Sequence, residues 1–288
     1  MTAATPPPAT SPPPVPVALI LAVALRRIRD DLLVALTLVL IPTGVHTVVS
    51  FAEVAVMLAA PDANPVLVTC ATLVVTTAAF IPAATAWHRR IILPPGDPGA
   101  SGRYRIGRAE FLYAKAAAFV LVTTLALLVG LLMALRGLSD SAGFDAAWMD
   151  ASVVRWPIFF LAYGAVAMVV GAHWLTLPAA AIGQRLRLAE ANAIGRARGI
   201  RVGAAMALAF YGQVVFVAAT YRLGELLPVD RYGAVLVIVP AMFFPWVFVW
   251  NALLLFQIGV LSVAYVAALR GGSTAGTGPT LGARGTSP

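Results

Sequence analysis

Long apolar runs, separated by short polar segments, dominate the hydrophobic pattern of this chain. A helix needs about 20 residues to cross the hydrocarbon core of a bilayer. The runs that meet this length cover residues 32–52, 65–87, 116–135, 157–182, 202–220 and 232–269. The pattern predicts an all-α fold, a polytopic transmembrane helical bundle with about six crossings arranged as three hairpins with interfacial helices.

The last apolar run is too long for one straight crossing. Pro240 and Pro245 are places where it can kink or break. We interpret residues 232–246 as an outer half-helix that leads into one crossing. A seventh crossing would need a split near Asn251, where no polar turn separates the two halves.

The two ends of the chain differ from its apolar middle. Residues 1–14 are a proline-rich tail and residues 271–288 a Gly/Thr-rich tail, and both are expected to be disordered around a membrane domain at 15–270. The apolar stretch 15–25 is too short to cross and is stopped by "RRIRDD", so an interfacial entry helix is expected. It lacks a positive region before it and a clear cleavage site, so we expect no cleaved signal peptide.

Composition places the chain in the membrane class. Hydrophobic residues make up 60% of the sequence and charged residues 11%, far from the balance of a soluble domain. The net charge of +8 arises from clusters between apolar runs, which argues against nucleic acid as a partner. Cys70 is the single cysteine, so the chain cannot form an internal disulfide.

Basic residues are strongly biased to alternate loops. Of the 20 lysines and arginines, 16 lie in the loops on one side of the membrane. Only four lie on the other side: Arg136, Arg155, Arg222 and Arg231. Because cytoplasmic loops carry the excess of basic residues, this bias predicts a multi-pass protein with both termini in the cytoplasm.

His46 and Glu53 are the intramembrane polar candidates. At about 1.5 Å per residue from Leu32, His46 lies roughly 21 Å deep and Glu53 roughly 31 Å, at the outer boundary. There the carboxylate can be hydrated or can pair with Arg136 or Arg155. His46 is either a proton relay or an ordinary packing residue bonded to a carbonyl or to Ser50.

The other histidines adjoin tryptophans at helix ends. We interpret Trp87 and Trp174 as aromatic-belt residues, with His88 and His173 beside them at headgroup level. No histidine pair has zinc-site spacing, and neither a nucleophile elbow nor a phosphate-binding loop is found. We therefore expect no enzyme activity, catalytic residue, metal or cofactor.

Polar and small residues in the later crossings are expected to serve helix packing. Gln213, Asn251 and Gln257 can bond across helices, although they could also line a pathway. Small residues allow close helix approach, and they include Gly164, Ala167, Gly171, Gly203 and Ala207.

Five arginines crowd the loop after the fourth crossing, with only Glu190 to offset them: Arg185, Arg187, Arg196, Arg198 and Arg201. This arginine collar either binds anionic lipid headgroups or serves only to orient the chain during insertion.

One family resemblance accompanies these residues. "WHRR", together with "LTLPAAAIGQRLRLAEANAIGRARGIR", resembles a group of uncharacterised bacterial six-helix membrane proteins, which is similar to the membrane domain attached to some glycerophosphodiester phosphodiesterases. The resemblance covers roughly residues 15–270 and implies hairpins with interfacial helices between them. The phosphodiesterase domain is absent, so no catalytic residue carries over.

Two functions remain open. One is a non-catalytic bundle that organises lipids or partner proteins in a bacterial inner membrane, with anionic lipids, a second copy or another membrane protein as partner. The alternative is a small permease or transporter component, favoured by His46 and by the proline-containing last run.

Overall fold

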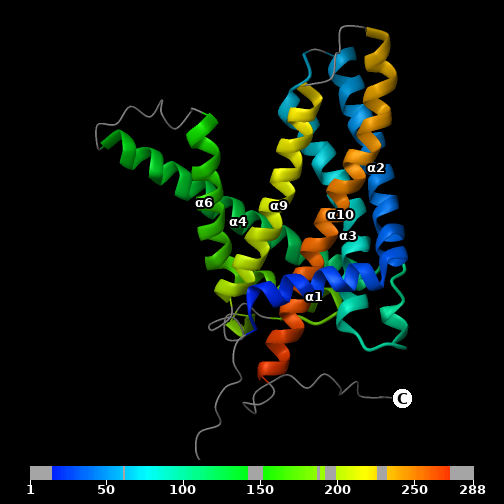
Figure 1. The fold of residues 1–288 in the computed structure, drawn as a ribbon, viewed down its shortest axis with the longest axis vertical. Helices are drawn as coiled ribbons and strands as arrows, with labels where there is room; N and C mark the ends of the chain where they lie inside the picture. Colours follow the sequence, from blue (N-terminus) through cyan, green and yellow to red (C-terminus); the bar gives the residue numbers. More distant parts are fainter. Residues whose placement is uncertain are drawn as a thin grey trace, which may run out of the picture.

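The computed structural model describes residues 15–60, 62–141, 152–186, 189–191, 199–225 and 232–272, and the regular structure in these residues is helical. The elements, coloured along the chain in Figure 1, are α1 (Val17–Asp30), α2 (Leu32–Ala59), α3 (Pro65–Ile92), η1 (Pro98–Ala100), α4 (Arg108–Ser141), α6 (Ser152–Trp174), α7 (Thr176–Ala181), α9 (Gly199–Glu225) and α10 (Tyr232–Gly272).

Within these described residues, six helical segments are long and apolar enough to cross a membrane. They are Leu32–Ala59, Pro65–Ile92, Arg108–Ser141, Pro157–Ala181, Gly199–Phe216 and Phe243–Leu269. The predicted all-α bundle with six crossings is confirmed, and the chain is a multi-pass membrane protein. The helices extend beyond most of the predicted runs, because polar and basic residues continue a helix past the hydrocarbon layer.

Successive crossings alternate in direction (Figure 1). One end of the bundle holds the starts of α2, α4 and α9 and the final turns of α3, α6 and α10. We call this the basic end, because Arg89, Arg90, Arg103 and Arg105 lie there, and we call the opposite end the distal end. Both ends of the described chain, Val15 and Gly272, are at the basic end.

α1 lies across the basic end of the bundle rather than alongside the crossings (Figure 1). It buries Ile20 and Ala24 against the bundle. This is the position expected of an interfacial entry helix. The helix ends at Asp30, within "RRIRDD", as predicted. Its last turn includes Arg27 and Arg29, where cations suit the negative end of the helix dipole.

α6 and α9 approach each other so closely that side chains are excluded between their backbones. A Cβ atom added to Gly203 would lie 2.6 Å from the Met168 Cα, and one added to Gly171 would lie 2.6 Å from the Gly203 nitrogen. Either position is too close for any residue larger than glycine. The predicted role of the small residues in close helix packing is confirmed.

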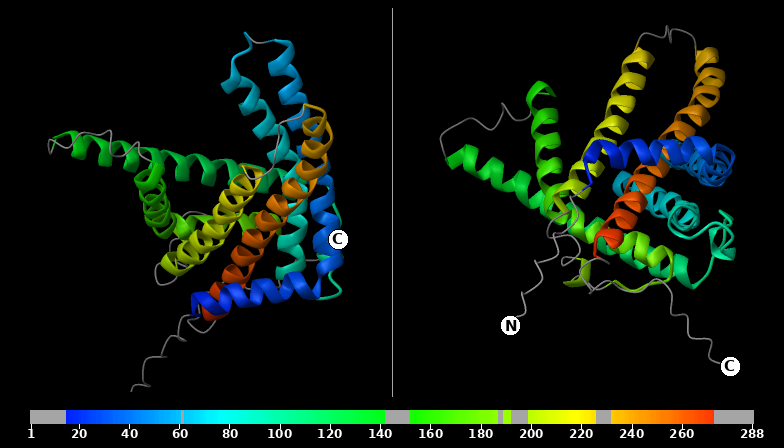
Figure 2. Two further views of the ribbon diagram at one scale, coloured as in Figure 1. Left: turned by 45° about the horizontal axis from the view of Figure 1, so that its top comes forward. Right: turned by 60° about the horizontal axis from the view of Figure 1, so that its bottom comes forward.

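The buried core is concentrated in the half of the bundle next to the basic end. The buried residues of α2 lie between Ala35 and Thr43, and those of α3 between Pro82 and His88. We call this part the basic half and the remainder the distal half. In the distal half α4 and α6 diverge from the other crossings, and the end of α4 projects away from α2 and α3 in Figures 1 and 2.

α10 is one continuous helix of 41 residues, so the predicted half-helix at 232–246 does not form a separate element. Neither Pro240 nor Pro245 ends it. Proline removes one helical hydrogen bond, but within membranes neighbouring groups can compensate the freed carbonyl. α10 also includes Gly271 and Gly272, two residues beyond the predicted domain boundary.

Candidate functional site

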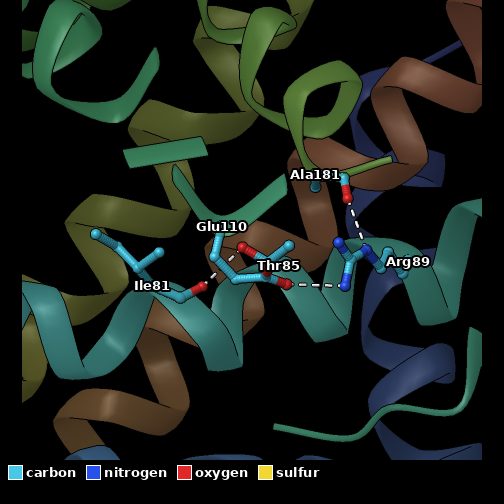
Figure 3. Close-up of polar contacts among 5 residues, drawn as sticks. All are labelled: Ile81, Thr85, Arg89, Glu110 and Ala181. Atoms are coloured by element: carbon cyan, nitrogen blue, oxygen red, sulfur yellow. Dashed lines mark hydrogen bonds and ion pairs between the residues drawn. The ribbon is translucent and has the colours of Figure 1, made fainter. Parts of the chain in front are cut away.

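The end of α3 carries two adjacent arginines that are both paired within the protein. Arg89 donates from Nε to the Ala181 carbonyl at 2.7 Å and from a terminal nitrogen to Glu110 Oε1 at 2.8 Å (Figure 3). Arg90 donates to Asp31 Oδ1 at 2.5 Å. The first arginine therefore joins α3 to α4 and α7, and the second joins α3 to the junction between α1 and α2.

The pair between Arg89 and Glu110 is largely buried, with 17% and 7% of the two side chains exposed. Charges removed from water are stabilised only when they are paired and hydrogen-bonded. The third partner, Ala181, contributes the carbonyl at the end of α7, where the helix dipole also favours a cation. One guanidinium thus holds three elements in a fixed relation.

His88 joins α3 to α10 through a hydrogen bond. Its Nδ1 lies 2.7 Å from Ser262 Oγ, and that hydroxyl donates to the Ile258 carbonyl at 2.9 Å. Because the serine proton is directed to the carbonyl, the imidazole is assigned as the Nδ1–H tautomer, a choice derived from the hydrogen-bond network. The Tyr113 ring packs against this imidazole, with the centroids 5.4 Å apart.

The burial of His88 corrects the sequence interpretation of the histidine–tryptophan pairs. Trp87 and His88 are both 0% exposed, and Trp174 is 5% exposed, so these side chains belong to the core. α10 packs over the last turns of α3, so Trp87 lies among packed helices rather than facing lipid headgroups. His173 is half-buried.

Two amide contacts form a deeper part of the site. Gln257 Nε2 donates to Gln213 Oε1 at 2.6 Å, and Asn251 Nδ2 donates to Thr43 Oγ1 at 3.1 Å. The first joins α10 to α9 and the second joins α10 to α2. The prediction that these amides bond across helices is confirmed.

The position of these groups along α10 explains how one helix contacts partners on two sides. Asn251 and Ser262 are 11 residues apart, about three turns, so they face the same side, toward α2 and α3. Gln257 lies between them in sequence and faces α9. We call the paired groups together the polar layer; its members are Asp31, Thr43, His88, Arg89, Arg90, Glu110, Gln213, Asn251, Gln257 and Ser262.

His46 and Glu53 lie outside the polar layer, toward the distal half of α2. Glu53 accepts a hydrogen bond from Thr69 Oγ1 of α3 at 2.7 Å. Among the described side chains, its partner is therefore this threonine and not the arginine that the sequence suggested. His46 is half-buried, and no hydrogen bond joins it to Ser50. Among the described residues, His46 does not lie in a cluster of side chains that could hold a metal ion.

The arginine collar is described only at its two ends. Arg185 is exposed, whereas Arg201 is partly buried and donates to the Val15 carbonyl at 3.4 Å, next to the start of α1. Arg187, Arg196 and Arg198 lie outside the described residues. Arg201 therefore has a protein partner rather than a fully free guanidinium.

Sequence reasoning missed the contacts of "WHRR" and the role of Glu110. The sequence did contain a signal: Glu110 is a carboxylate near the start of the helix that follows a basic loop. If such a carboxylate is buried, it needs a cationic partner. Which arginine supplies that partner depends on how α3, α4 and α7 pack together.

No family model, curated protein or solved structure matches this chain. The resemblance to the membrane domain of glycerophosphodiester phosphodiesterases therefore stays a prediction.

Proposed function

We propose that this chain is a non-catalytic integral membrane protein that organises lipids or partner proteins. The observation that supports this most directly is the pairing of the polar layer. Each of its charged and amide side chains bonds to a group outside its own helix. These bonds fix the positions of the helices relative to one another. A rigid bundle of this kind holds surfaces for other molecules rather than moving a substrate.

The distal half supports the same proposal. There the crossings expose large apolar side chains on several sides, including Leu58 at 80%, Val74 at 67% and Met133 at 70%. In a bilayer such side chains face acyl chains or another membrane protein. A fixed basic half with diverging distal helices presents more of this apolar surface than a closed bundle does.

The proposed location is the bacterial inner membrane with the basic end in the cytoplasm. This orientation follows from the bias of arginine and lysine between the two ends. With Cys70 replaced by serine, Ser141→Cys should react with an impermeant thiol reagent applied from outside. Ser101→Cys should react only after the membrane is opened. Reverse labelling would reject the orientation.

The function is tested by reconstituting the full chain into proteoliposomes that carry fluorescent anionic and neutral lipids. We expect energy transfer from the protein's tryptophans to the labelled anionic lipid to exceed transfer to the neutral one. Ion and solute flux should equal that of protein-free liposomes. Flux that depends on an added substrate would overturn the proposal.

A small permease is the second candidate, because several buried polar atoms lack a partner among the described residues. They are Thr47 Oγ1, Trp87 Nε1, His88 Nε2, His173 Nδ1 and Gln213 Nε2. Polar atoms of this kind can line a pathway. The candidate predicts proton or solute flux that His46→Leu or His88→Leu abolishes, and the oligomeric state in mild detergent would show whether two copies form it.

A further inference from the structure

The connection between α3 and α4 is held firmly against the basic half. The hydroxyl of Tyr104 donates to the Ala79 carbonyl at 2.6 Å, and its ring packs against the core cluster that contains Trp87. Burial raises the pKa of the Tyr104 phenol above its usual range, which keeps the donor protonated. Gly102 has a positive φ of 63°, and a Cβ there would lie 2.7 Å from Val34 Cγ1.

Because Tyr104 points inward, the residues on either side of it point outward. Neighbouring side chains of an extended chain face opposite directions, and Arg103 and Arg105 are both exposed. Ile106 follows and is 86% exposed. The segment thus presents two cations and one large apolar side chain to its surroundings.

The first turns of α4 continue this surface. Arg108, Phe111 and Lys115 are spaced three and four residues apart, so they share one face of the helix. Arg108 and Lys115 are exposed, and Phe111 is 60% exposed. The Lys115 Nζ lies 4.5 Å from the centroid of the Phe111 ring, a cation–π contact. We call the whole surface the cationic edge: Arg103, Arg105, Ile106, Arg108, Phe111 and Lys115.

The cations of the cationic edge differ from the arginines of α3. Arg89 and Arg90 are in salt bridges, whereas no salt bridge joins Arg103, Arg105, Arg108 or Lys115 to a described residue. Glu110 lies within the same stretch of sequence, but it points inward to Arg89 and does not neutralise the edge. The charged members of the cationic edge itself are therefore all basic.

We propose that the cationic edge is a docking surface for the headgroups of anionic phospholipids. Ile106 and Phe111 insert at the boundary of the acyl chains, and the basic side chains reach the phosphate groups above them. An acidic soluble protein would be matched by the cations but not by two exposed apolar side chains at a membrane boundary. The inference rests on the proposed lipid role and assigns it to residues other than the collar, where Arg201 contacts Val15.

The test compares lipid retention by the full chain and by the double variant Arg103→Gln/Arg105→Gln. Each protein is purified in neutral detergent, exposed to equal amounts of phosphatidylglycerol and phosphatidylcholine, and examined by native mass spectrometry over a salt series. The double variant should bind phosphatidylglycerol roughly 25-fold more weakly, as expected for the loss of two basic residues at an anionic surface. Phosphatidylcholine binding should not change.

Arg136→Gln is the control, because Arg136 is an exposed arginine in the distal part of α4, the helix that follows Arg103 and Arg105. It should keep the phosphatidylglycerol affinity of the unaltered chain. Since all three arginines are exposed, the variants should unfold at the same temperature as the unaltered chain. An equal loss in the Arg136 variant would mean a general charge effect and would overturn the proposal.

Other outcomes separate this inference from the proposed function. If the unaltered chain prefers phosphatidylglycerol and the double variant keeps that preference in full, the cationic edge is rejected and the lipid role stands. If the unaltered chain shows no preference, both are rejected. Binding of a polyglutamate peptide that depends on Arg103 and Arg105, without a lipid preference, would reject the edge in favour of an acidic protein partner.

Discussion

The basic half and the distal half of this bundle are built from the same helices, yet they are stabilised differently. In the basic half, salt bridges and side-chain hydrogen bonds join α3 to α2, α4, α7 and α10, and the core lies among them. In the distal half, large apolar side chains of the described residues are exposed. Apolar surface alone does not hold helices together in lipid, because lipid tails are equally apolar.

This comparison shows where a membrane bundle obtains its specificity. Close backbone approach and polar pairing distinguish one helix arrangement from another, and in the part of the chain that the structure describes both lie mainly in the basic half. The distal helices are then free to face lipid or a partner. Substitutions with matched controls in the two halves test the comparison.

The largest effect is expected for Glu110→Ala. The substitution leaves the buried Arg89 guanidinium without its carboxylate, which should reduce the free energy of unfolding by about 3–5 kcal/mol. Unfolding in mixed micelles with increasing denaturing detergent measures this. Asp30→Ala is the control, because its pair with Arg29 is exposed on both sides and should contribute little. Replacing both buried partners, with Arg89→Met and Glu110→Leu, should restore most of the loss. Equal effects of Glu110→Ala and Asp30→Ala would contradict the contrast.

Smaller changes in the free energy of unfolding, of opposite sign, are expected when two glycines are replaced by alanine. Gly203→Ala forces α9 away from the Met168 backbone and should cost about 1–3 kcal/mol. Gly130→Ala, in the distal part of α4, places its methyl group where no atom lies within 4 Å. That substitution should be neutral or stabilising by up to about 1 kcal/mol, because alanine favours helix. The same unfolding assay reports both, and destabilisation by Gly130→Ala would show that the distal half is packed more tightly than described.

The amide pair of the polar layer should contribute less. Interhelical hydrogen bonds average about 0.6 kcal/mol, so Gln257→Leu should lower stability by roughly that amount. A double-mutant cycle with Gln213→Leu isolates the pair, and the two effects should not add. Strict additivity would mean that the two amides do not interact in the membrane.

The smallest effect is expected at Glu53 in the distal half. In Glu53→Gln the amide oxygen still accepts from Thr69, so stability should change by no more than about 0.5 kcal/mol. Thr69→Val, which removes the donor, is the paired variant, and its effect should also be small. A large loss in either variant would place Glu53 in a buried network and bring the distal half closer to the basic half.

The sequence predicted the class of fold because that information is local. Twenty or so consecutive apolar residues specify a crossing wherever they occur, and short polar turns specify the hairpins. The stop at "RRIRDD" was confirmed, because α1 ends at Asp30, whereas the separate half-helix at 232–246 was wrong, because α10 continues through Pro240 and Pro245. The sequence predicted that Gln213 and Gln257 bond across helices, since an amide in lipid needs a partner. It did not predict that they bond to each other.

The candidate site was harder to predict, as His88 and Glu110 illustrate. From the sequence, His88 lies at a helix end beside tryptophan, which is typical of a headgroup position. In the structure, α10 covers it and Ser262, 174 residues later, binds it. Nothing local distinguishes a covered helix end from an exposed one.

The sequence by itself therefore determined that this chain crosses a membrane about six times, with an excess of positive charge at one end. Hydropathy and loop charge act through each segment's own transfer free energy, which depends little on its neighbours. Only the tertiary structure decided that Arg89 and Arg90 are paired with carboxylates of other helices or helix junctions, while Arg103 and Arg105 remain at the surface. A buried charge is stable only beside its partner, and the packing of distant helices determines where that partner lies.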